Sequence, residues 1–175
     1  DRKRKLPITT LLYALGYKKE EILDLFYDFK TFNFDQKTKK WKTKFNPDDY
    51  KRPIKLRDDL INSTNGKKVL KKGSKINFAI AKKIYEEGLK NFLVSSDYFL
   101  EKYTKNDLLN PLTKEIFLKS ASPISRESLD LILELNINTL TIADVDPINK
   151  GSYIIDTLNI DKNESKEDAI NDIYK

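Results

Sequence analysis

The chain is 175 residues long, which is enough to bury a core in one domain or in two small ones. It has neither cysteine nor histidine, so disulfides, thiol chemistry, Ser-His triads and histidine-bound metals are excluded. The absence of cysteine also fits a reducing cytoplasm, which is the expected location. Hydrophobic residues make up 39% and charged residues 34%, and no run of 18 apolar residues exists, so we expect a large polar surface and no membrane-spanning helix.

The net charge of +6 is distributed unevenly along the chain. Residues 1–83 carry 23 Lys/Arg against 10 Asp/Glu, whereas residues 84–175 carry 10 against 17. A basic N-terminal half favours an anionic partner such as nucleic acid. The alternative is that most of these lysines form a solvated surface without a specific partner.

Four cations open the chain and lead directly into an apolar segment: Arg2, Lys3, Arg4 and Lys5. Pro7 is expected to be a first-turn residue that holds this basic cluster at the entrance of a helix. The pattern predicts that helix over residues 8–15, ended by Gly16, and a second helix over residues 18–29. The apolar face of the second helix is predicted to consist of Ile22, Leu25, Phe26 and Phe29.

Near Thr31 the spacing of apolar residues changes from about 3.6 to about two, which predicts a strand pair joined by a loop over residues 35–39. The alternating apolar residues are Phe32, Phe34, Trp41, Thr43 and Phe45, and lysines 40, 42 and 44 occupy the other face. These lysines could bind phosphate, or they could keep an edge strand soluble. We favour the second interpretation, because the aromatic rings lie on the opposite face and cannot stack on bases beside the lysines.

A repeat with an offset of 48 residues begins near Lys67. It predicts two strand-helix-strand units, with Asn77 and Ser125 as helix N-caps and with Gly88 and Asn136 as helix stops. The matched apolar positions are Ile76, Ile84, Leu89, Phe92 and Val94 in the first copy and Ile124, Ile132, Ile137, Leu140 and Ile142 in the second.

Two further helices are predicted over residues 151–158 and 163–174. The expected fold class is therefore α+β, with helical ends at residues 1–30 and 151–175 flanking a mixed α/β domain at 31–150 that contains the two-fold repeat. This is the layout of a domain inserted into a helical parent.

The sequence offers little catalytic chemistry. No glycine-rich phosphate loop is present. Three acidic pairs, Asp48-Asp49, Asp58-Asp59 and Asp144 with Asp146, could hold a magnesium ion, but turns and caps use the same residues, and we favour that role. We expect no self-contained enzyme.

Both ends of the chain resemble one known family. Residues 1–17, DRKRKLPITTLLYALGY, and EILDLF at 21–26 closely resemble the lobe region of the bacterial RNA polymerase β subunit. GSYIIDTL at 151–158, Asp161, Ala169 and DIYK at 172–175 are similar to the segment beyond that lobe's insertion. The middle of the chain matches only in pattern.

The resemblance implies that the chain is an internal segment of a much longer β subunit, and that its middle is the insertion of proteobacterial lobes. In this family the lobe lines the cleft for downstream DNA. The residues implied to face double-stranded DNA are Arg2, Lys3 and Arg4, with Lys5 as a further candidate. The family commonly has arginine where Lys3 stands, and a lysine retains phosphate contact better than base reading.

The resemblance also implies the enzyme class, DNA-directed RNA polymerase, a nucleotidyltransferase of the cytoplasm. No catalytic residue, metal or cofactor is expected in this segment, because the magnesium of the family is held by another subunit. The implied partners are the β′, α, ω and σ subunits, DNA, and regulatory transcription factors that can meet the insertion. The alternative function is a free-standing basic module that docks an acidic protein and has no role with nucleic acid.

Overall fold

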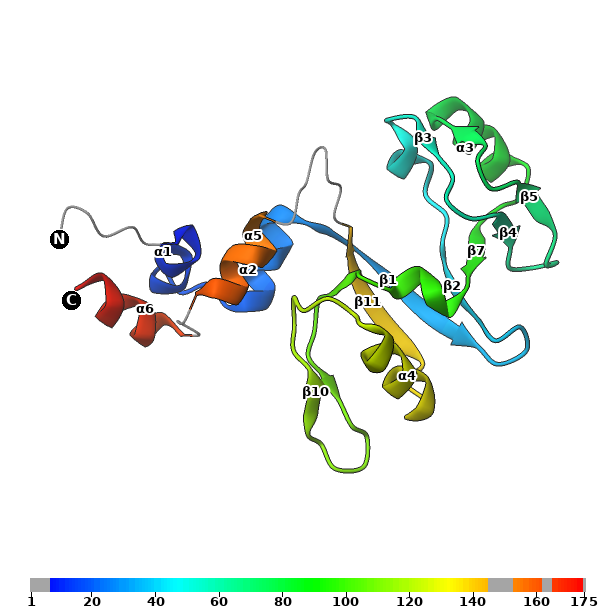
Figure 1. Cartoon of the computed structure of the whole chain (residues 1–175). Coiled ribbons are helices and arrows are strands. Elements are labelled where there is room, and N and C mark those ends of the chain that lie inside the picture. Colours follow the sequence, from blue (N-terminus) through cyan, green and yellow to red (C-terminus); the bar gives the residue numbers. More distant parts are fainter. Residues whose placement is uncertain (1–6, 145–152, 162–164, 175) are drawn as a thin grey trace. The chain divides into compact units, whose positions relative to one another are not determined.

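The structure is a computed structural model that describes residues 7–144, 153–161 and 165–174 (Figure 1). Its contacts divide the chain into two compact units. Unit 1 comprises Asp1–Phe29, Leu100–Asn136 and Thr141–Lys175, and unit 2 comprises Lys30–Phe99 and Ile137–Leu140. The chain changes unit four times: within the strands β1 (Asp28–Asp35) and β11 (Thr139–Asp144), after Phe99 and after Asn136.

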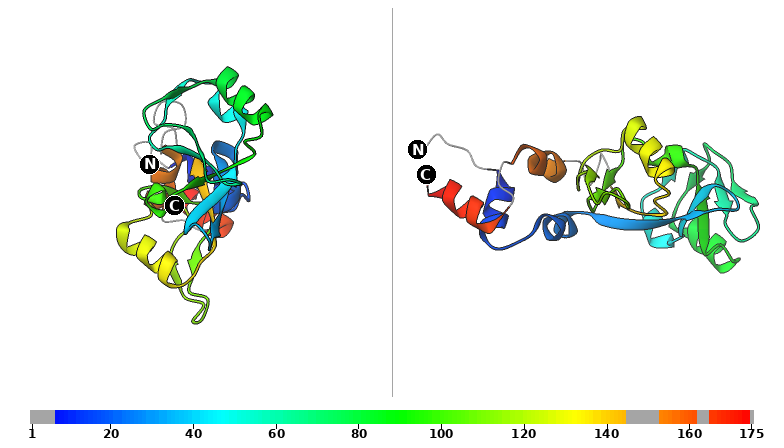
Figure 2. Two further views of the ribbon diagram at one scale, coloured as in Figure 1. Left: turned by 90° about the vertical axis from the view of Figure 1, so that its right-hand side faces the viewer. Right: turned by 90° about the horizontal axis from the view of Figure 1, so that it is seen from below.

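Four helices from the two ends of the chain pack together in unit 1. They are α1 (Ile8–Ala14), α2 (Lys19–Phe26), α5 (Tyr153–Ile160) and α6 (Lys166–Ile173). Helix α1 lies against α6 (Figure 2). Helix α5 contacts both α1 and α2. Their shared core includes Tyr13, Ile22, Leu23 and Ile155, all at most 2% exposed. The predicted helical ends of the chain therefore exist and meet each other.

The first two helices end differently from each other. Gly16 follows α1 with φ at +102°, a left-handed conformation that suits glycine, as predicted. Helix α2 ends at Phe26 and not at Phe29, because Tyr27 is already extended and β1 begins at Asp28. The predicted apolar face of α2 is also partly wrong. Leu25, which was assigned to it, is 54% exposed, whereas Leu23, which was not, is fully buried.

Unit 2 is built on antiparallel strands in the order β5, β4, β7, β2 and β1. The bounds are β2 (Lys40–Lys44), β4 (Leu60–Asn62), β5 (Lys68–Leu70) and β7 (Asn91–Val94). The predicted hairpin is confirmed, with Asn33 opposite Lys42 and Asp35 opposite Lys40. The prediction that β2 is an edge strand is wrong, because β7 pairs with the side of β2 opposite to β1 and makes β2 an interior strand.

Aromatic rings fill the core of unit 2. Phe32, Trp41 and Phe99 are each at most 1% exposed, and the Phe99 ring centre lies 5.0 Å from that of Phe32 and 5.2 Å from that of Trp41. The indole N–H of Trp41 donates a hydrogen bond to Ser96 Oγ at 3.1 Å. Phe32 and Trp41, which were predicted to lie on the apolar face of β1 and β2, therefore pack in the core of unit 2.

The remaining elements are short. The 3₁₀ helices are η1 (Pro47–Tyr50) and η2 (Ser96–Phe99). The strands β3 (Ile54–Lys55) and β6 (Lys75–Ile76) form one ladder, β9 (Leu108–Leu109) and β10 (Ile116–Leu118) form another, and β8 (Tyr103–Thr104) pairs with β11.

The 48-residue repeat is confirmed in its helices, caps and stops, while the strand before the helix is reduced to an isolated bridge at Pro123 in the second copy. Helix α3 (Phe78–Glu86) has its exact counterpart in α4 (Arg126–Glu134), 48 residues further on. The side chain of Asn77 accepts the N–H of Ile80, and that of Ser125 accepts the N–H of Ser128, so both predicted caps form. Gly88 and Asn136 both have positive φ, at +121° and +56°, as helix stops.

The repeat extends further towards the N-terminus than the sequence pattern indicated. The hairpin of β4 and β5 corresponds to that of β9 and β10 at the same offset. Asp59 accepts the N–H of Lys72 at 2.7 Å, and Asp107 accepts the N–H of Ser120 at 2.6 Å. We call residues 54–94 the first copy and residues 102–142 the second copy.

The α+β fold class is confirmed. The compact units do not follow the expected ranges 1–30, 151–175 and 31–150, since residues 100–136 group with the helical ends. Compactness, however, does not test where a family insertion begins, so those domain ranges stay a prediction.

Candidate nucleic-acid interface

The predicted DNA-binding residues, Arg2, Lys3, Arg4 and Lys5, lie outside the residues that the structure describes. Pro7, two residues after this cluster in the sequence, is the N-cap residue of α1, with φ at −59°. Its carbonyl accepts the N–H of Thr10 at 3.0 Å. The structure therefore describes the helix that follows the basic cluster in the sequence, and what holds that helix in place.

Helix α1 is held by hydrogen bonds between the two ends of the chain, which we call the anchor: Thr9 and Thr10 with Asp161. The hydroxyls of Thr9 and Thr10 both donate hydrogen bonds to Asp161 Oδ2, at 2.6 Å and 3.1 Å. Both threonines are fully buried, and Asp161 directly follows α5. Because hydrogen bonds to a charged group are among the stronger ones in proteins, this anchor fixes the first turn of α1 against the C-terminal helices.

The anchor was not predicted from the sequence. Thr9 and Asp161 are 152 residues apart, and no local pattern connects a threonine in a helix to an aspartate that far away. The signal that existed was indirect, because these residues belong to the two terminal stretches that resemble one family.

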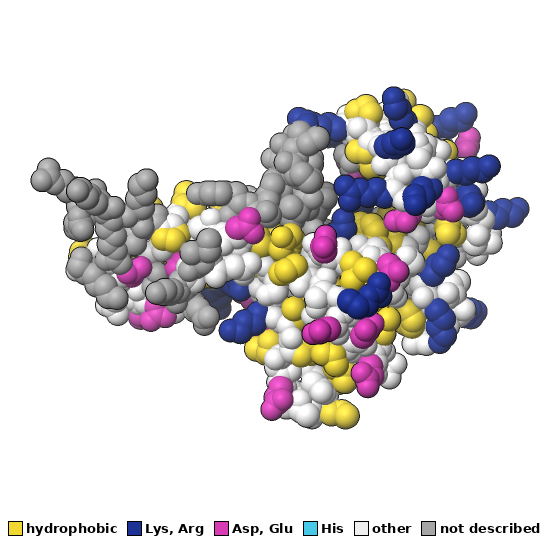
Figure 3. All heavy atoms as spheres, in the orientation of Figure 1, with side chains coloured by type: hydrophobic (Ala, Val, Ile, Leu, Met, Phe, Trp, Pro, Cys, Tyr) yellow, Lys and Arg dark blue, Asp and Glu magenta, His cyan; other side chains and the backbone are white. Residues whose placement is uncertain are grey.

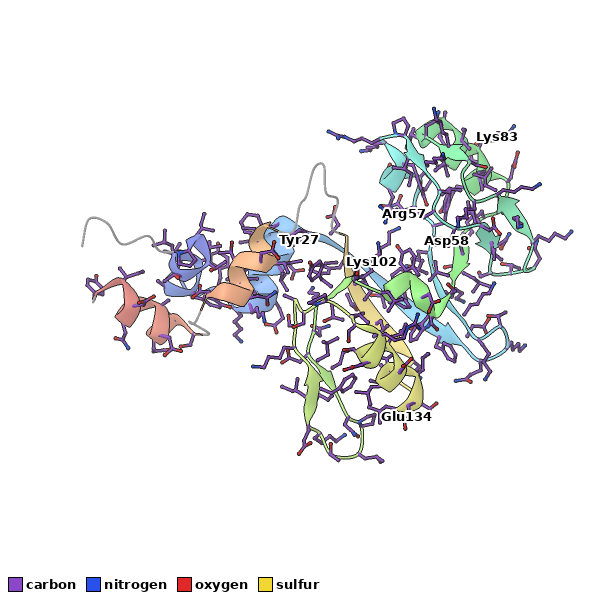
Figure 4. All side chains as sticks on the ribbon, viewed as in Figure 1. Tyr27, Arg57, Asp58, Lys83, Lys102 and Glu134 are labelled. Atoms are coloured by element: carbon purple, nitrogen blue, oxygen red, sulfur yellow. The ribbon has the colours of Figure 1, made fainter. Side chains whose placement is uncertain are left out.

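Positive charge gathers in unit 2. This unit contains 18 Lys/Arg against eight Asp/Glu, whereas unit 1 contains 15 against 19. Figure 3 shows many of the Lys and Arg side chains spread over unit 2 on the face in view. Arg57 and Asp58 follow β3, and Lys83 lies on α3 (Figure 4). The basic N-terminal half seen in the sequence is therefore largely the surface of one compact unit.

One carboxylate in each of the first two acidic pairs has a partner in the structure. Asp49 forms an ion pair with Lys30 at 2.6 Å. Asp59 binds the N–H of Lys72 and the ammonium of Lys68, and the hydrogen bond from Lys72 is the main reason that the pKa of this carboxyl lies below its ordinary value. Of the third pair, Asp144 ends β11 and Asp146 lies outside the described residues.

Within residues 7–144, 153–161 and 165–174, no group of three or more acidic side chains is placed to hold a metal ion. A hollow of about 650 Å³ in unit 1 is lined by charges of both signs, among them Lys18, Glu20, Asp107, Lys119 and Asp161. Such a mixed lining favours neither an anion nor a cation. No helix in this described part is long and apolar enough to cross a membrane.

Comparison with known proteins gives a consistent result along the whole chain. No model of a protein family matches it. The chain is 35% identical over 175 residues to the DNA-directed RNA polymerase subunit beta of Caulobacter vibrioides (strain NA1000 / CB15N), which covers 100% of this chain and 13% of that protein. It is 38% identical to the subunit beta of Rickettsia canadensis (strain McKiel) and 34% identical to that of Rhizobium leguminosarum bv. trifolii (strain WSM2304), again over the full chain and 12% of each relative.

The chain thus spans about an eighth of the length of these relatives. The match runs through the middle of the chain as well as through its ends, where the sequence alone showed the resemblance. Along its whole length the chain is a relative of one segment of the bacterial DNA-directed RNA polymerase β subunit, and the family resemblance seen in the sequence is confirmed.

Proposed function

We propose that this chain acts as a non-catalytic segment of a DNA-directed RNA polymerase β subunit, the lobe with its insertion, and that it lines the cleft for downstream duplex DNA in the cytoplasm. The observation that carries the proposal is the identity of 34–38% over the full length of the chain to three β subunits. The nucleotidyltransferase activity belongs to the whole polymerase, to which this segment contributes a wall and a docking surface.

The chemistry of the described residues supports a non-catalytic role. Polymerases join nucleotides at metal ions held by carboxylates. The carboxylates of Asp49 and Asp59 are instead engaged by Lys30, Lys68 and a backbone N–H. We therefore propose that the segment needs no cofactor of its own, and that magnesium is held by another subunit of the enzyme.

Exposed apolar side chains at α1 favour contact of unit 1 with another part of the polymerase. Ile8 and Leu11 lie on α1 and Leu15 is its C-cap residue; the three are spaced three and four residues apart and are 45%, 49% and 74% exposed. On α2, Leu25 adds a further exposed leucine at 54%. We propose that these side chains pack against the rest of the β subunit or against the β′, α, ω or σ subunits, and that regulatory factors dock on the insertion.

The DNA contact is assigned to Arg2, Lys3 and Arg4, with Lys5 as a further cation. Such contacts neutralise phosphates and release counterions, so binding weakens as salt rises. We expect the chain to bind duplex DNA weakly and without sequence preference. The contribution of the cluster to the salt slope should correspond to about two to four phosphates.

The test is fluorescence anisotropy with a labelled duplex over a range of salt concentrations. The triple variant Arg2→Ala, Lys3→Ala, Arg4→Ala should lose the slope that belongs to the cluster. A matched control removes three exposed cations from the hairpin of β1 and β2: Lys37→Gln, Lys42→Gln and Lys44→Gln. If the cluster variant and this hairpin control change the slope equally, the assignment of Arg2, Lys3 and Arg4 is wrong.

A further inference from the structure

The two copies of the repeat share a hairpin and a capped helix but differ in charge. The first copy, residues 54–94, contains ten Lys/Arg and four Asp/Glu, whereas the second copy, residues 102–142, contains five of each. Because the second copy builds the same helix, caps and hairpin without this excess, the fold does not require the additional cations of the first copy. The second copy therefore serves as an internal reference for the role of these cations.

Several of these cations gather on one small ribbon. Leu56 and Gly73 join the two sides, since the N–H of Leu56 donates to Ser74 O at 2.9 Å and that of Gly73 donates to Leu56 O at 2.8 Å. We define the basic ribbon as the exposed cations on β3, on β6 and in the residues next to them: Lys55, Arg57, Lys71, Lys72 and Lys75.

Two lysines of the ribbon face each other. Lys55 and Lys75 are register partners in the antiparallel ladder of β3 and β6, and both are exposed. Side chains directly opposite each other lie on the same face of a ladder, where like charges destabilise the pairing. In the second copy the same two positions are the uncharged pair Tyr103 and Pro123. The first copy thus keeps a repulsive pair that its own duplicate lacks.

Two nearby carboxylates, Asp58 and Asp59, offset only part of the charge of the five cations. Asp59 is engaged by Lys68 at 3.1 Å and by the backbone N–H of Lys72. Asp107 accepts the equivalent N–H in the second copy, so this hydrogen bond belongs to the turn itself. Among the described residues, no ion pair is formed by Lys55, Lys72 or Lys75.

We propose that the basic ribbon binds the phosphate backbone of duplex DNA without reading its sequence. Four of its five cations are lysines, which neutralise phosphates as point charges but lack the fork that pairs with base edges. A row of phosphates is the partner that relieves the repulsion between Lys55 and Lys75, because the duplex carries a dense, regular line of negative charge.

Other anionic partners fit the surface less well. Single strands are held by aromatic rings on which bases stack, and none of the five residues of the basic ribbon is aromatic. Phe78 and Tyr85 of this unit are 39% and 37% exposed, but they lie on α3 and not on the ribbon. The centres of protein interfaces are depleted in lysine. An acidic protein is therefore the less favoured partner, and its binding is an outcome that the experiment separates.

The proposal goes beyond the function proposed above and does not depend on it. It concerns residues in unit 2, whereas the DNA-facing cluster is Arg2, Lys3 and Arg4. The two sets are tested by different variants, so either assignment can fail while the other holds.

The experiment uses the full chain and two labelled duplexes of unrelated sequence, with anisotropy measured between about 50 and 200 mM salt. The ribbon variant is Lys55→Gln, Lys72→Ser, Lys75→Gln, in which Ser is the residue of the second copy at position 120. The control for an equal loss of charge is the hairpin variant Lys37→Gln, Lys42→Gln, Lys44→Gln.

We expect the salt slope of the ribbon variant to be smaller by about 2.7, which is about 0.9 for each of three cations. Raising the salt fourfold should therefore weaken DNA binding by the unmodified chain about 40-fold more than binding by the ribbon variant. The hairpin control should retain the slope, and both duplexes should bind equally. A charge-preserving variant, Lys55→Arg, Lys72→Arg, Lys75→Arg, should also retain it. Equal slopes for the ribbon variant and the hairpin control would overturn the proposal.

Two further measurements keep the test decisive. On the unmodified chain, added duplex should shift the NMR amide signals of residues 54–57 and 71–76, and unchanged signals there would contradict the proposal even if the ribbon variant did not fold. Polyglutamate serves as the acidic-protein probe. If the ribbon variant lost affinity for polyglutamate but not for the duplex, the ribbon would be a protein-docking surface and the proposal would be wrong.

Discussion

Removing the carboxylate of Asp161 should loosen the first turn of α1. In Asp161→Ala, the buried hydroxyls of Thr9 and Thr10 lose their shared acceptor, at 2.6 Å and 3.1 Å. A hydrogen bond to a charged group stabilises a protein by about 1.5–3 kcal/mol. Both donors share one oxygen and Asp161 is partly exposed, so we expect a loss of about 2–3 kcal/mol for the pair.

Hydrogen exchange measured by mass spectrometry can locate this loss. A change of about 2–3 kcal/mol in the local opening free energy corresponds to exchange that is about 30- to 150-fold faster, and we expect it in α1 and α6. The fluorescence of Trp41, which lies in the core of unit 2, provides a separate report on that unit.

The control for this variant is Asp130→Ala, which removes an exposed carboxylate from α4 in the same unit. It should leave the exchange of α1 unchanged. A double-mutant cycle of Asp161→Ala with Thr9→Val should give a coupling energy of about 1–2 kcal/mol. Unchanged exchange in α1 of Asp161→Ala, or a coupling near zero, would show that the anchor does not hold the helix.

Three further variants test other parts of the fold. Thr104→Val should stabilise the chain by about 1 kcal/mol in thermal unfolding, because Thr104 Oγ1 is buried without a hydrogen-bond partner among the described residues and the first copy has Leu56 there; a lower midpoint would contradict this. Gly88→Ala should cost about 1–2 kcal/mol in denaturant unfolding followed by Trp41 fluorescence, since φ is +121° although a Cβ would meet nothing within 4 Å; an unchanged midpoint would refute the backbone argument. The carboxyl of Asp59 should titrate by NMR at a pKa below 3.8, so its contribution to stability is present above the ordinary pKa and is lost as the pH falls through the lowered one; an ordinary pKa would show that the bond from the Lys72 amide is not formed in solution.

Local sequence signals predicted the parts of the fold that local chemistry determines. Asn77 and Ser125 were identifiable as caps because a short polar side chain before an apolar helical pattern satisfies a free N–H of the first turn. Gly88 and Asn136 were identifiable as stops because few other residues adopt a positive φ readily. These four positions mark the start and the end of the helix in each copy, so the alignment of the two copies follows from the sequence alone.

Contacts between segments that are distant in the sequence were not predictable from local patterns. The position of β2 inside the sheet depends on β7, which is about 50 residues away, and the lysines of β2 gave no sign of that neighbour. The N-terminal part of the repeat was missed because β3 and β6 have two residues each, too few for a periodic pattern. Of the proposed DNA contacts, the cluster at Arg2 depended on family resemblance, while the basic ribbon needed the pairing of Lys55 with Lys75.

The duplication separates what the fold needs from what a surface can add. Asp59 and Asp107 occupy equivalent positions and bind equivalent backbone N–H groups, so the structural need explains both carboxylates. Lys55 and Lys75 have no such explanation, because the equivalent residues Tyr103 and Pro123 pair in an isolated β-bridge without charge. A residue retained by both copies is accounted for by the shared backbone. A repulsive pair present in only one copy requires a reason outside the fold, and a row of phosphates supplies one that can be measured.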